Sequence, residues 1–427
     1  MNILKDNKAL IISILTLSVP AIVEMLLNTL VGISDTVLLS FYVGKDGLAA
    51  SGYANQIIYM VILVFSSFNV GATAMISRSY GEKNYQKLNE VSCENLILNS
   101  VLGLAMMMIT FLFSRQFMHI FDTTRTVFDM SISFLNITSF SLLFMFFSFA
   151  AGASLRGIGN TMTPMLITGG VNVINIILNI LLIRGVGIFP EMGIQGSALA
   201  TTISRIIGAG AYLLILLNHK GHLRISKAAL KLKKEIFMPL WQLSYKAGVE
   251  QFLTQFAFFI SGIIVSILDT TSEAAFRVLL TIEQVSIMPA IGISIAAATL
   301  VGKSLGEKDN KKARFTGYLC FGMGIMWGIL IGTFFAVFPN FTARLFTPDA
   351  AILSVLVGAM LAVAIDQPII NYIFIVSGAL RGAGDTTTVM ILTSLRLWIF
   401  FLPLTYVFVK YMGMGVKSIW VAEIIGA

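Results

Sequence analysis

The sequence predicts an all-α integral membrane protein of twelve transmembrane helices, arranged as two related six-helix bundles. The first observation is composition: 57% of the 427 residues are hydrophobic and only 12% are charged, whereas soluble domains carry about 25% charged residues. The second is a series of apolar runs along the whole chain, each long enough for a helix to cross a bilayer core of about 30 Å. Membrane β-strands would give shorter segments of alternating hydrophobicity. The third is an internal repeat.

The apolar runs give the expected positions of the helices. A last run begins near Val416 and stops at Ala427, and about twelve residues are too few to cross a bilayer. We therefore expect it to be a truncated twelfth helix. The complete spans are expected at 11–40, 48–76, 91–113, 127–151, 162–183, 195–217, 240–267, 275–302, 315–338, 351–378 and 388–409.

The internal repeat predicts the domain organisation. The segment 80–84 (YGEKN) returns at 305–309 as LGEKD, and 154–161 (SLRGIGNT) returns at 379–386 as ALRGAGDT, in both cases 225 residues later. Two motifs at one offset indicate a tandem duplication of six spans. An even number of spans inserts both halves in the same orientation, which gives a pseudo-twofold axis along the membrane normal. The expected parts are an N-terminal lobe at 1–217, a cytoplasmic linker at 218–239 and a C-terminal lobe at 240–427.

The loop charges predict the orientation. Most loop Lys and Arg residues lie on the same side as the N-terminus, with the largest group in the linker 218–239. Positive loops stay in the cytoplasm, so we expect a multi-pass protein of the plasma (cell inner) membrane with a cytoplasmic N-terminus. This topology also explains the net charge of +8 without a nucleic-acid partner. Residues 226–237 read as a short basic amphipathic helix on the membrane surface.

The first span carries a polar stripe. Glu24, Asn28, Gly32 and Asp35 follow one another at steps of four, four and three, so they share one face of a helix. A charged side chain at the bilayer centre costs at least about 2.5 kcal/mol. The stripe is therefore expected to face a cavity or the bundle interior, and we interpret the first helix as a wall of a transport pathway.

The fifth span carries a row of amides on one face, namely Asn172, Asn175 and Asn179. Their counterparts one repeat later are apolar: Leu397, Phe400 and Leu404. Together with Asp35, and with Thr201 of the sixth span, these oxygens suit a hard cation or a proton. The alternative is that the asparagines only join helices by hydrogen bonds, each worth about 0.6 kcal/mol.

Other charged residues lie within predicted spans. Glu250 stands one turn from Lys246 and could simply pair with it, while Asp366 could serve a functional role or cap a broken helix. Arg205 and Arg396 are expected to pair or to extend toward the interface. The candidates for a substrate site or second cation site are Glu24, Asn28, Asn172, Glu250 and Asp366. Arg277 and Glu283 of the eighth span are interpreted as structural.

Several classes of function are disfavoured. A Walker A sequence is absent from the chain, which argues against direct ATP hydrolysis. Cys93 and Cys320 have no metal-binding spacing, and no combination of acids, His and Cys suggests catalysis. We therefore expect a protein that is not an enzyme and needs no cofactor. A receptor or a channel remains an alternative, although the duplication favours a transporter that works by alternating access.

The motifs resemble those of the multidrug and toxic compound extrusion (MATE) family, and the resemblance covers nearly the whole chain. The segments that carry it are 20–22 (PAI), 35–37 (DTV), 71–82, 155–157 (LRG), 193–201 (GIQGSALAT) and 299–302 (TLVG). The resemblance implies twelve helices in two lobes and alternating-access export of organic cations or other amphipathic drugs against H⁺ or Na⁺. It also implies drug-like substrates within a lipid bilayer, and we expect a monomer. The runner-up is a flippase for lipids or lipid-linked oligosaccharides, but these more often carry extra helices and a strongly cationic cavity.

The resemblance also assigns roles to residues. The family's coupling acid of the first helix matches Asp35, which would be a Na⁺ ligand if the transporter is sodium-coupled. One branch has an Asn and, four residues later, a second Asp on the fifth helix. Those positions match Asn175 and Asn179 here, so the second carboxylate is absent and the coupling ion stays open between H⁺ and Na⁺. Another branch uses acids on the seventh and tenth helices, where Glu250 and Asp366 lie.

Overall fold

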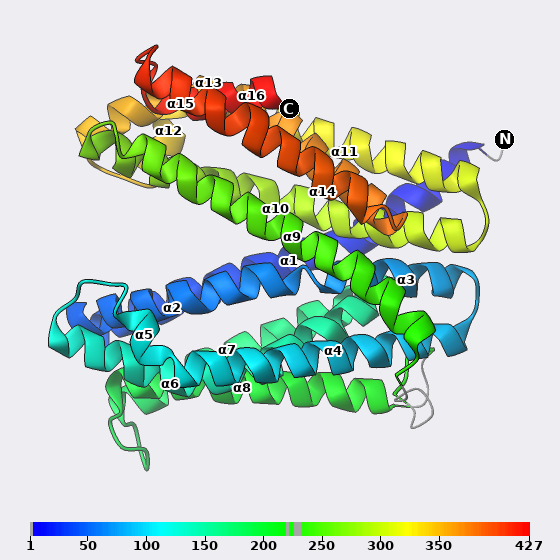
Figure 1. Ribbon diagram of the computed structural model, residues 1–427, viewed down its shortest axis with the longest axis horizontal. Helices are drawn as coiled ribbons and strands as arrows, with labels where there is room; N and C mark the ends of the chain where they lie inside the picture. The colour runs from blue at the N-terminus through cyan, green and yellow to red at the C-terminus, as the bar shows by residue number, and fades with distance from the viewer. Residues whose placement is uncertain (1–2, 219–221, 226–231) are drawn as a thin grey trace. The chain divides into compact units, whose positions relative to one another are not determined.

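A computed structural model of the protein describes residues 3–218, 222–225 and 232–427 (Figure 1). All regular structure in these residues is helical. The chain divides into two compact units. The N-unit is Val23–Ser244, and the C-unit is Met1–Ile22 together with Tyr245–Ala427.

The N-unit is a helical bundle in which α4 packs against α6 and α6 packs against α8, while α7 lies along α8 (Figure 1). Phe134, Leu142 and Phe146 of α6 are buried at its centre. Its helices are most of α1 (Ile3–Tyr42), α2 (Lys45–Ser66), α3 (Asn69–Gly81), α4 (Tyr85–Leu112), α5 (Ser114–Met118), α6 (Arg125–Gly157), α7 (Met162–Arg184), α8 (Gly193–Leu217) and the beginning of α9 (Lys234–Val265).

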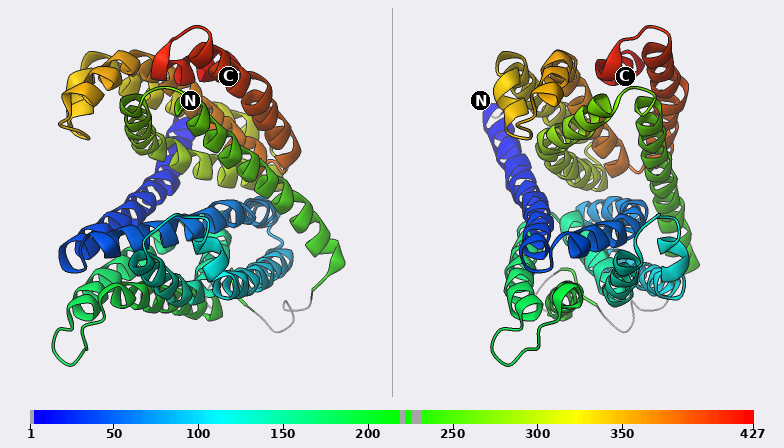
Figure 2. Two further views of the ribbon diagram at one scale, coloured as in Figure 1. Left: turned by 60° about the vertical axis from the view of Figure 1, so that its left-hand side comes forward. Right: turned by 90° about the vertical axis from the view of Figure 1, so that its left-hand side faces the viewer.

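The C-unit is built around α13, which packs against both α10 and α11. Figure 2 shows α15 and α16, in red, at the C-terminal end of this unit, where Phe401 and Trp420 are fully buried. Besides parts of α1 and α9, its elements are α10 (Thr270–Gly306), α11 (Asn310–Val337), α12 (Pro339–Arg344), α13 (Ala350–Gly382), α14 (Thr386–Leu395), the π-helical turn η1 (Arg396–Phe401), α15 (Leu402–Lys410), the 3₁₀ turn η2 (Gly415–Lys417) and α16 (Ser418–Gly426).

The predicted all-helical membrane architecture is confirmed, with differences in individual spans. In the described part of the chain, ten helices are long and apolar enough to cross a membrane. The span expected at 48–76 is divided into α2 and α3 at Ser67–Phe68, and the span expected at 388–409 is interrupted by η1. The final helix, α16, has nine residues. The total of twelve crossing helices stays a prediction.

The internal repeat is visible in the backbone. Among the described residues, only Lys83 and Lys308 adopt a positive φ without being glycine, at 56° and 60°. These two lysines are 225 residues apart. Gly159 and Gly384, also repeat partners, both have φ of 86°, a conformation that glycine adopts without steric cost. The duplicated motifs therefore encode duplicated turns at the ends of the helices.

Two helices contribute to both units. The beginning of α1, as far as Ile22, belongs to the C-unit, where Gly292 of α10 leaves room for Ile22 and for the Ser18 carbonyl. The beginning of α9, as far as Ser244, belongs to the N-unit, where a Cβ on Gly71 would lie 2.7 Å from the Ser244 hydroxyl. The compact units thus differ from the predicted lobes at these two helices. The first half of the amphipathic helix expected at 226–237 lies outside the described residues, and its end is the first turn of α9.

Candidate functional site

Four of the predicted cation-site residues form one hydrogen-bonded chain in the N-unit. Asn179 Nδ2 on α7 donates to Asp35 Oδ1 on α1 at 2.6 Å and to Asn175 Oδ1 at 3.0 Å. Asn175 Nδ2 in turn donates to Thr201 Oγ1 on α8 at 3.4 Å. Asn175 and Asn179 are buried, while Asp35 and Thr201 are partly buried. The spacing of four residues on α7 places both amides in one row between α1 and α8.

One oxygen in this chain has no donor. Asn179 is fully buried, so water does not reach its side chain, and its Oδ1 accepts no hydrogen bond. Leaving a buried acceptor unsatisfied costs about 1–3 kcal/mol, which a cation or a proton donor at this position would relieve. The group offers one carboxylate, two amide oxygens and one hydroxyl, which is the all-oxygen set that hard cations prefer. The residues present therefore fit the predicted cation chemistry.

A basic side chain lies near this acid. The Arg205 guanidinium on α8 donates from Nη1 to the Ser141 hydroxyl at 2.6 Å. Its charge interacts with that of Asp35, but the described residues contain no direct ion pair between them. In the described residues Arg205 thus hydrogen-bonds Ser141 without forming an ion pair, and it places a positive charge near the one carboxylate of the chain.

The remaining members of the two polar stripes have separate roles. Asn172 Nδ2 donates to the Leu27 carbonyl at 2.8 Å and so ties α7 to the backbone of α1. This bond matches the helix-joining interpretation. Asn28 is exposed on α1. The structure therefore brings Asn172 to α1 but outside the chain that begins at Asp35.

Glu24 and Glu250 form equivalent ion pairs in the two repeats. Glu24 Oε1 lies 3.3 Å from Arg156 Nη1, and Glu250 Oε1 lies 2.6 Å from Arg381 Nη2. Both arginines belong to the duplicated Leu-Arg-Gly turn. The suggested pairing of Glu250 with Lys246 is wrong, because Lys246 Nζ donates to the Thr387 hydroxyl instead. Each glutamate joins the first helix of its repeat to the end of the fourth.

Asp366 lies in a different environment from Glu250. It is fully buried on α13 and faces two further acids, Glu283 of α10 and Glu423 of α16. The sequence around Glu423 does not predict this contact, because the short apolar run at the end of the chain does not indicate which helices pack against it. Glu283, for which the sequence predicts a structural role, accepts a hydrogen bond from Trp420 Nε1 at 3.2 Å.

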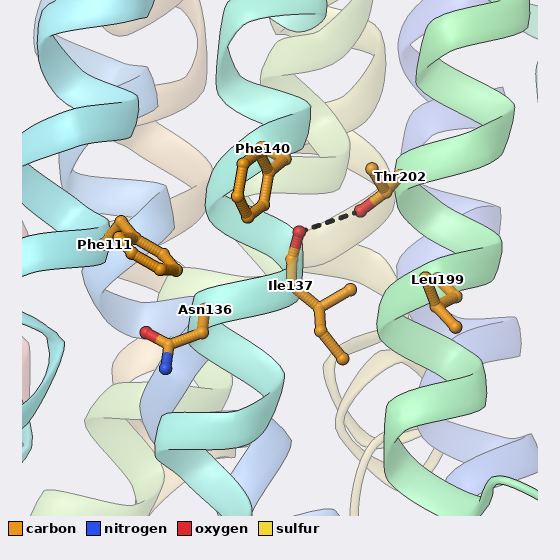
Figure 3. A pocket seen from close by; sticks show the side chains of 6 residues that line it. All are labelled: Phe111, Asn136, Ile137, Phe140, Leu199 and Thr202. Atoms are coloured by element: carbon orange, nitrogen blue, oxygen red, sulfur yellow. Dashed lines mark hydrogen bonds between the residues drawn. The ribbon is translucent and has the colours of Figure 1, made fainter.

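An open pocket lies on a different part of the N-unit. It has a volume of about 360 Å³, and Figure 3 shows Thr202 bonded to the Ile137 carbonyl at its wall, at 3.2 Å. The lining is almost entirely apolar, so the pocket can accept a hydrophobic group but offers no charge. The lining residues, from α4, α6 and α8, are Phe111, Asn136, Ile137, Phe140, Leu199 and Thr202.

Comparison with curated relatives gives matches along nearly the whole chain. The probable multidrug resistance protein NorM of Thermotoga maritima is 29% identical over 426 residues, which cover 96% of this chain and 88% of the relative. The multidrug resistance protein NorM of Burkholderia vietnamiensis is 26% identical over 416 residues, which cover 95% and 88%.

Solved structures show the same fold. A crystal structure of MATE in the bent conformation superposes with a TM-score of 0.90 at 21% identity, covering 97% of this chain and 91% of that one. A MOP superfamily transporter from Pyrococcus furiosus Vc1 superposes with a TM-score of 0.88, also at 21% identity, covering 97% and 92%.

The family model named MatE matches the chain twice, at residues 20–181 and 247–407. These segments coincide with the two halves of the internal repeat and include both Leu-Arg-Gly turns. The resemblance predicted from the sequence motifs is thereby confirmed, and the chain belongs to the MatE family, the multidrug and toxic compound extrusion transporters.

Proposed function

We propose that this protein is a secondary active exporter of organic cations and other amphipathic drugs, which it exchanges for protons through Asp35. The observation that carries the proposal is the hydrogen-bonded chain from Asp35 through Asn179 and Asn175 to Thr201. A carboxylate accepts the Asn179 amide hydrogen, whereas a protonated carboxyl can donate instead to the free Asn179 Oδ1. Loading Asp35 would therefore change the bonds between α1 and α7.

This change gives a route from ion binding to conformation. Because α1 and α7 are joined at Asp35 and again at Asn172, a different bonding pattern at Asp35 favours a different packing of α1. Substrate and ion then stabilise different states, and binding of one lowers the affinity for the other. The relatives named multidrug resistance protein NorM support drug-like substrates.

The charges near Asp35 support a proton as the coupling ion. Arg205 contributes a positive charge near Asp35. Asn179, a neutral residue, stands at the position where one family branch has its second carboxylate. A metal ion at this site would therefore meet a field with little net negative charge, whereas a proton forms a covalent bond to the carboxylate. This comparison supports H⁺ over Na⁺, with Asp35 as the Na⁺ ligand in the alternative case.

The proposal includes the arrangement in the membrane. Twelve crossing helices would form lobes at 1–217 and 240–427, joined by a cytoplasmic linker at 218–239, in a monomer of the plasma (cell inner) membrane. The loop charges support a cytoplasmic N-terminus. Cysteine labelling from either side of sealed vesicles would test the orientation.

Transport in proteoliposomes tests the function. We expect efflux of a fluorescent organic cation under an imposed proton gradient, no efflux under a sodium gradient, and loss of gradient-driven efflux in Asp35→Asn. The matched control is Asp129→Asn, which removes an exposed acid of α6 in the same unit and should transport normally. Normal transport by Asp35→Asn would refute the assignment, and no transport under either gradient would favour a lipid or lipid-linked oligosaccharide flippase.

A further inference from the structure

The beginning of α11, drawn in yellow in Figure 1, has an exposed side on which cations lie next to aromatic rings. Lys311, Arg314, Phe315 and Tyr318 follow one another at steps of three, one and three, so they share one side of the helix. All four are exposed, and the two rings are 42% and 63% exposed. The other side of α11 packs against α10 and α13. We call these four residues the α11 face.

The two cations of the α11 face have no acidic partner among the described residues. The nearby acids are engaged by Lys312, whose Nζ lies 2.8 Å from Glu307 Oε2 and whose backbone N–H donates to Asp309 at 2.9 Å. In the part of the chain that the structure describes, neither Lys311 nor Arg314 forms an ion pair. The α11 face therefore presents two uncompensated positive charges.

The equivalent face of the first repeat is covered. Asn84 and Asp309 cap α4 and α11 in the same way, 225 residues apart, which fixes the register of the two helices. In this register Asn89 and Glu90 of α4 are only 9% exposed, and Cys93 is fully buried. The residues of α4 that correspond to the α11 face are Gln86, Asn89, Glu90 and Cys93.

The cover comes from the chain that follows α8. Asn89 Nδ2 donates to the His222 carbonyl at 3.2 Å, and Asn89 Oδ1 accepts the Arg224 N–H at 2.7 Å. Lys233 Nζ donates to Glu90 Oε1 at 2.5 Å. The first repeat thus uses an amide and a carboxylate on this face to hold basic residues of its own chain.

The second repeat has the opposite chemistry at these positions. Arg314 replaces Asn89, and Phe315 replaces Glu90. A face that binds a basic segment in the first repeat therefore attracts an anion in the second. Its occupant also needs apolar groups about 6 Å further along the helix, because Tyr318 lies one turn after Arg314.

The exposed side of α11 continues beyond the rings as an apolar stripe. Gly322, Met326 and Ile329 follow Tyr318 at steps of four, four and three, and Met326 and Ile329 are exposed. A Cβ on Gly322 would meet no atom within 4 Å, so there is open space between Tyr318 and Met326. Because α11 is long and apolar enough to cross a membrane, this stripe is suited to contact acyl chains.

We propose that the α11 face binds an anionic phospholipid, with its phosphate on Lys311 and Arg314 and one acyl chain along the stripe from Tyr318 to Met326. Lys and Arg are the side chains that bind phosphate, and basic residues beside a membrane helix attract anionic lipids. Tyrosine is typical of the level of the lipid headgroups. The site goes beyond the proposed proton coupling at Asp35 and does not depend on it.

Native mass spectrometry of the full-length protein in detergent tests the selectivity. The protein is titrated with dioleoylphosphatidylglycerol or dioleoylphosphatidylcholine, which have the same acyl chains. We expect phosphatidylglycerol to stay bound at concentrations about tenfold below those of phosphatidylcholine, and Lys311→Gln/Arg314→Gln should weaken its binding about tenfold. The matched control is Arg115→Gln/Arg125→Gln, which removes two exposed cations of the N-unit and should bind as the wild type does.

Quenching by brominated lipids tests the position of the site. A bimane label is attached to Met326→Cys of α11 or to Val101→Cys, its repeat partner on α4. Both positions are exposed, whereas Cys93 and Cys320 are buried. In phosphatidylcholine bilayers that contain a small fraction of phosphatidylglycerol brominated on its chains, we expect about twofold stronger quenching at 326 than at 101. Brominated phosphatidylcholine should quench both labels equally.

The same double variant links the two measurements. In Lys311→Gln/Arg314→Gln the label at Met326→Cys should lose its stronger quenching by brominated phosphatidylglycerol, because the headgroup is no longer held. The proposal is overturned by equal binding of the two lipids, by equal quenching at 326 and 101, by a preference that survives in this variant, or by an equal loss in Arg115→Gln/Arg125→Gln.

Discussion

Asn179 donates a hydrogen bond of 2.6 Å to Asp35, which joins α7 to the polar stripe of α1. In the family branch with two acids this position of α7 carries a carboxylate. In this chain it carries an amide that can donate to one partner and accept from another. The hydrogen bonding between Asn179 and Asp35 can therefore change when Asp35 is protonated, and Asn179 adds no second charge to the site.

Introducing a second acid at position 179 should change which ion drives transport. We expect Asn179→Asp to bind Na⁺ and to give measurable efflux under a sodium gradient, because two carboxylates hold a metal ion more strongly than one. Gradient-driven efflux in proteoliposomes is the measurement. Asn172→Asp is the control, since Asn172 is bonded to the α1 backbone outside the chain, and an equal gain in that variant would contradict the interpretation.

The ion pair of Glu250 and Arg381 should stabilise the C-unit. Glu250 is 6% exposed, so Arg381→Ala leaves a buried carboxylate without its partner and should cost about 3–5 kcal/mol. Lys246→Ala removes a cation that bonds Thr387 instead and should cost much less. Thermal unfolding in detergent measures both, and similar losses in the two variants would show that the Arg381 contact has no special role.

A closed ring of amides should stabilise the N-unit. Asn69 donates to Asn99 at 3.1 Å, Asn99 to Asn95 at 3.0 Å and Asn95 to Asn69 at 3.0 Å. Asn95→Ala breaks two of these buried bonds and should cost about 1–3 kcal/mol. The comparison is Asn136→Ala, whose side-chain oxygen has no partner and which should lose little. Equal melting temperatures for the two variants would contradict this expectation.

The cap of α14 should give a pH-dependent contribution. The Thr388 hydroxyl, together with its backbone N–H at 3.0 Å, lowers the pKa of Asp385. A depressed native pKa stabilises the fold above the unfolded value of about 3.9, and this stabilisation is lost as pH falls through the native value. Asp385→Ala should cost about 1 kcal/mol at pH 7 and less near pH 3.

The repeat partner of this cap provides the control. Asn160 accepts the Thr163 N–H at 3.0 Å but does not titrate. The cost of Asn160→Ala should therefore be independent of pH. Unfolding temperatures at pH 3 and pH 7 compare the two variants, and a pH-independent loss for Asp385→Ala would refute the linkage.

Much of this protein can be predicted from the sequence, because the relevant signals are local. Composition and apolar length indicate membrane helices, and the repeated turns at Lys83 and Lys308 follow from duplicated motifs. Helical periodicity also aligns Asn175 with Asn179 and places Asp35 on the polar face of α1. Each of these features depends on residues within a few turns of one another.

The tertiary structure alone decides which helix faces meet. The rotation and register of packed helices depend on side-chain shapes along their whole contact, which local periodicity does not specify. The sequence therefore suggested Lys246 as the partner of Glu250, whereas packing brings Arg381 to it from 131 residues away. Packing likewise brings Glu423 to Asp366 and Glu283, so the three buried acids become visible only when α10, α13 and α16 are assembled.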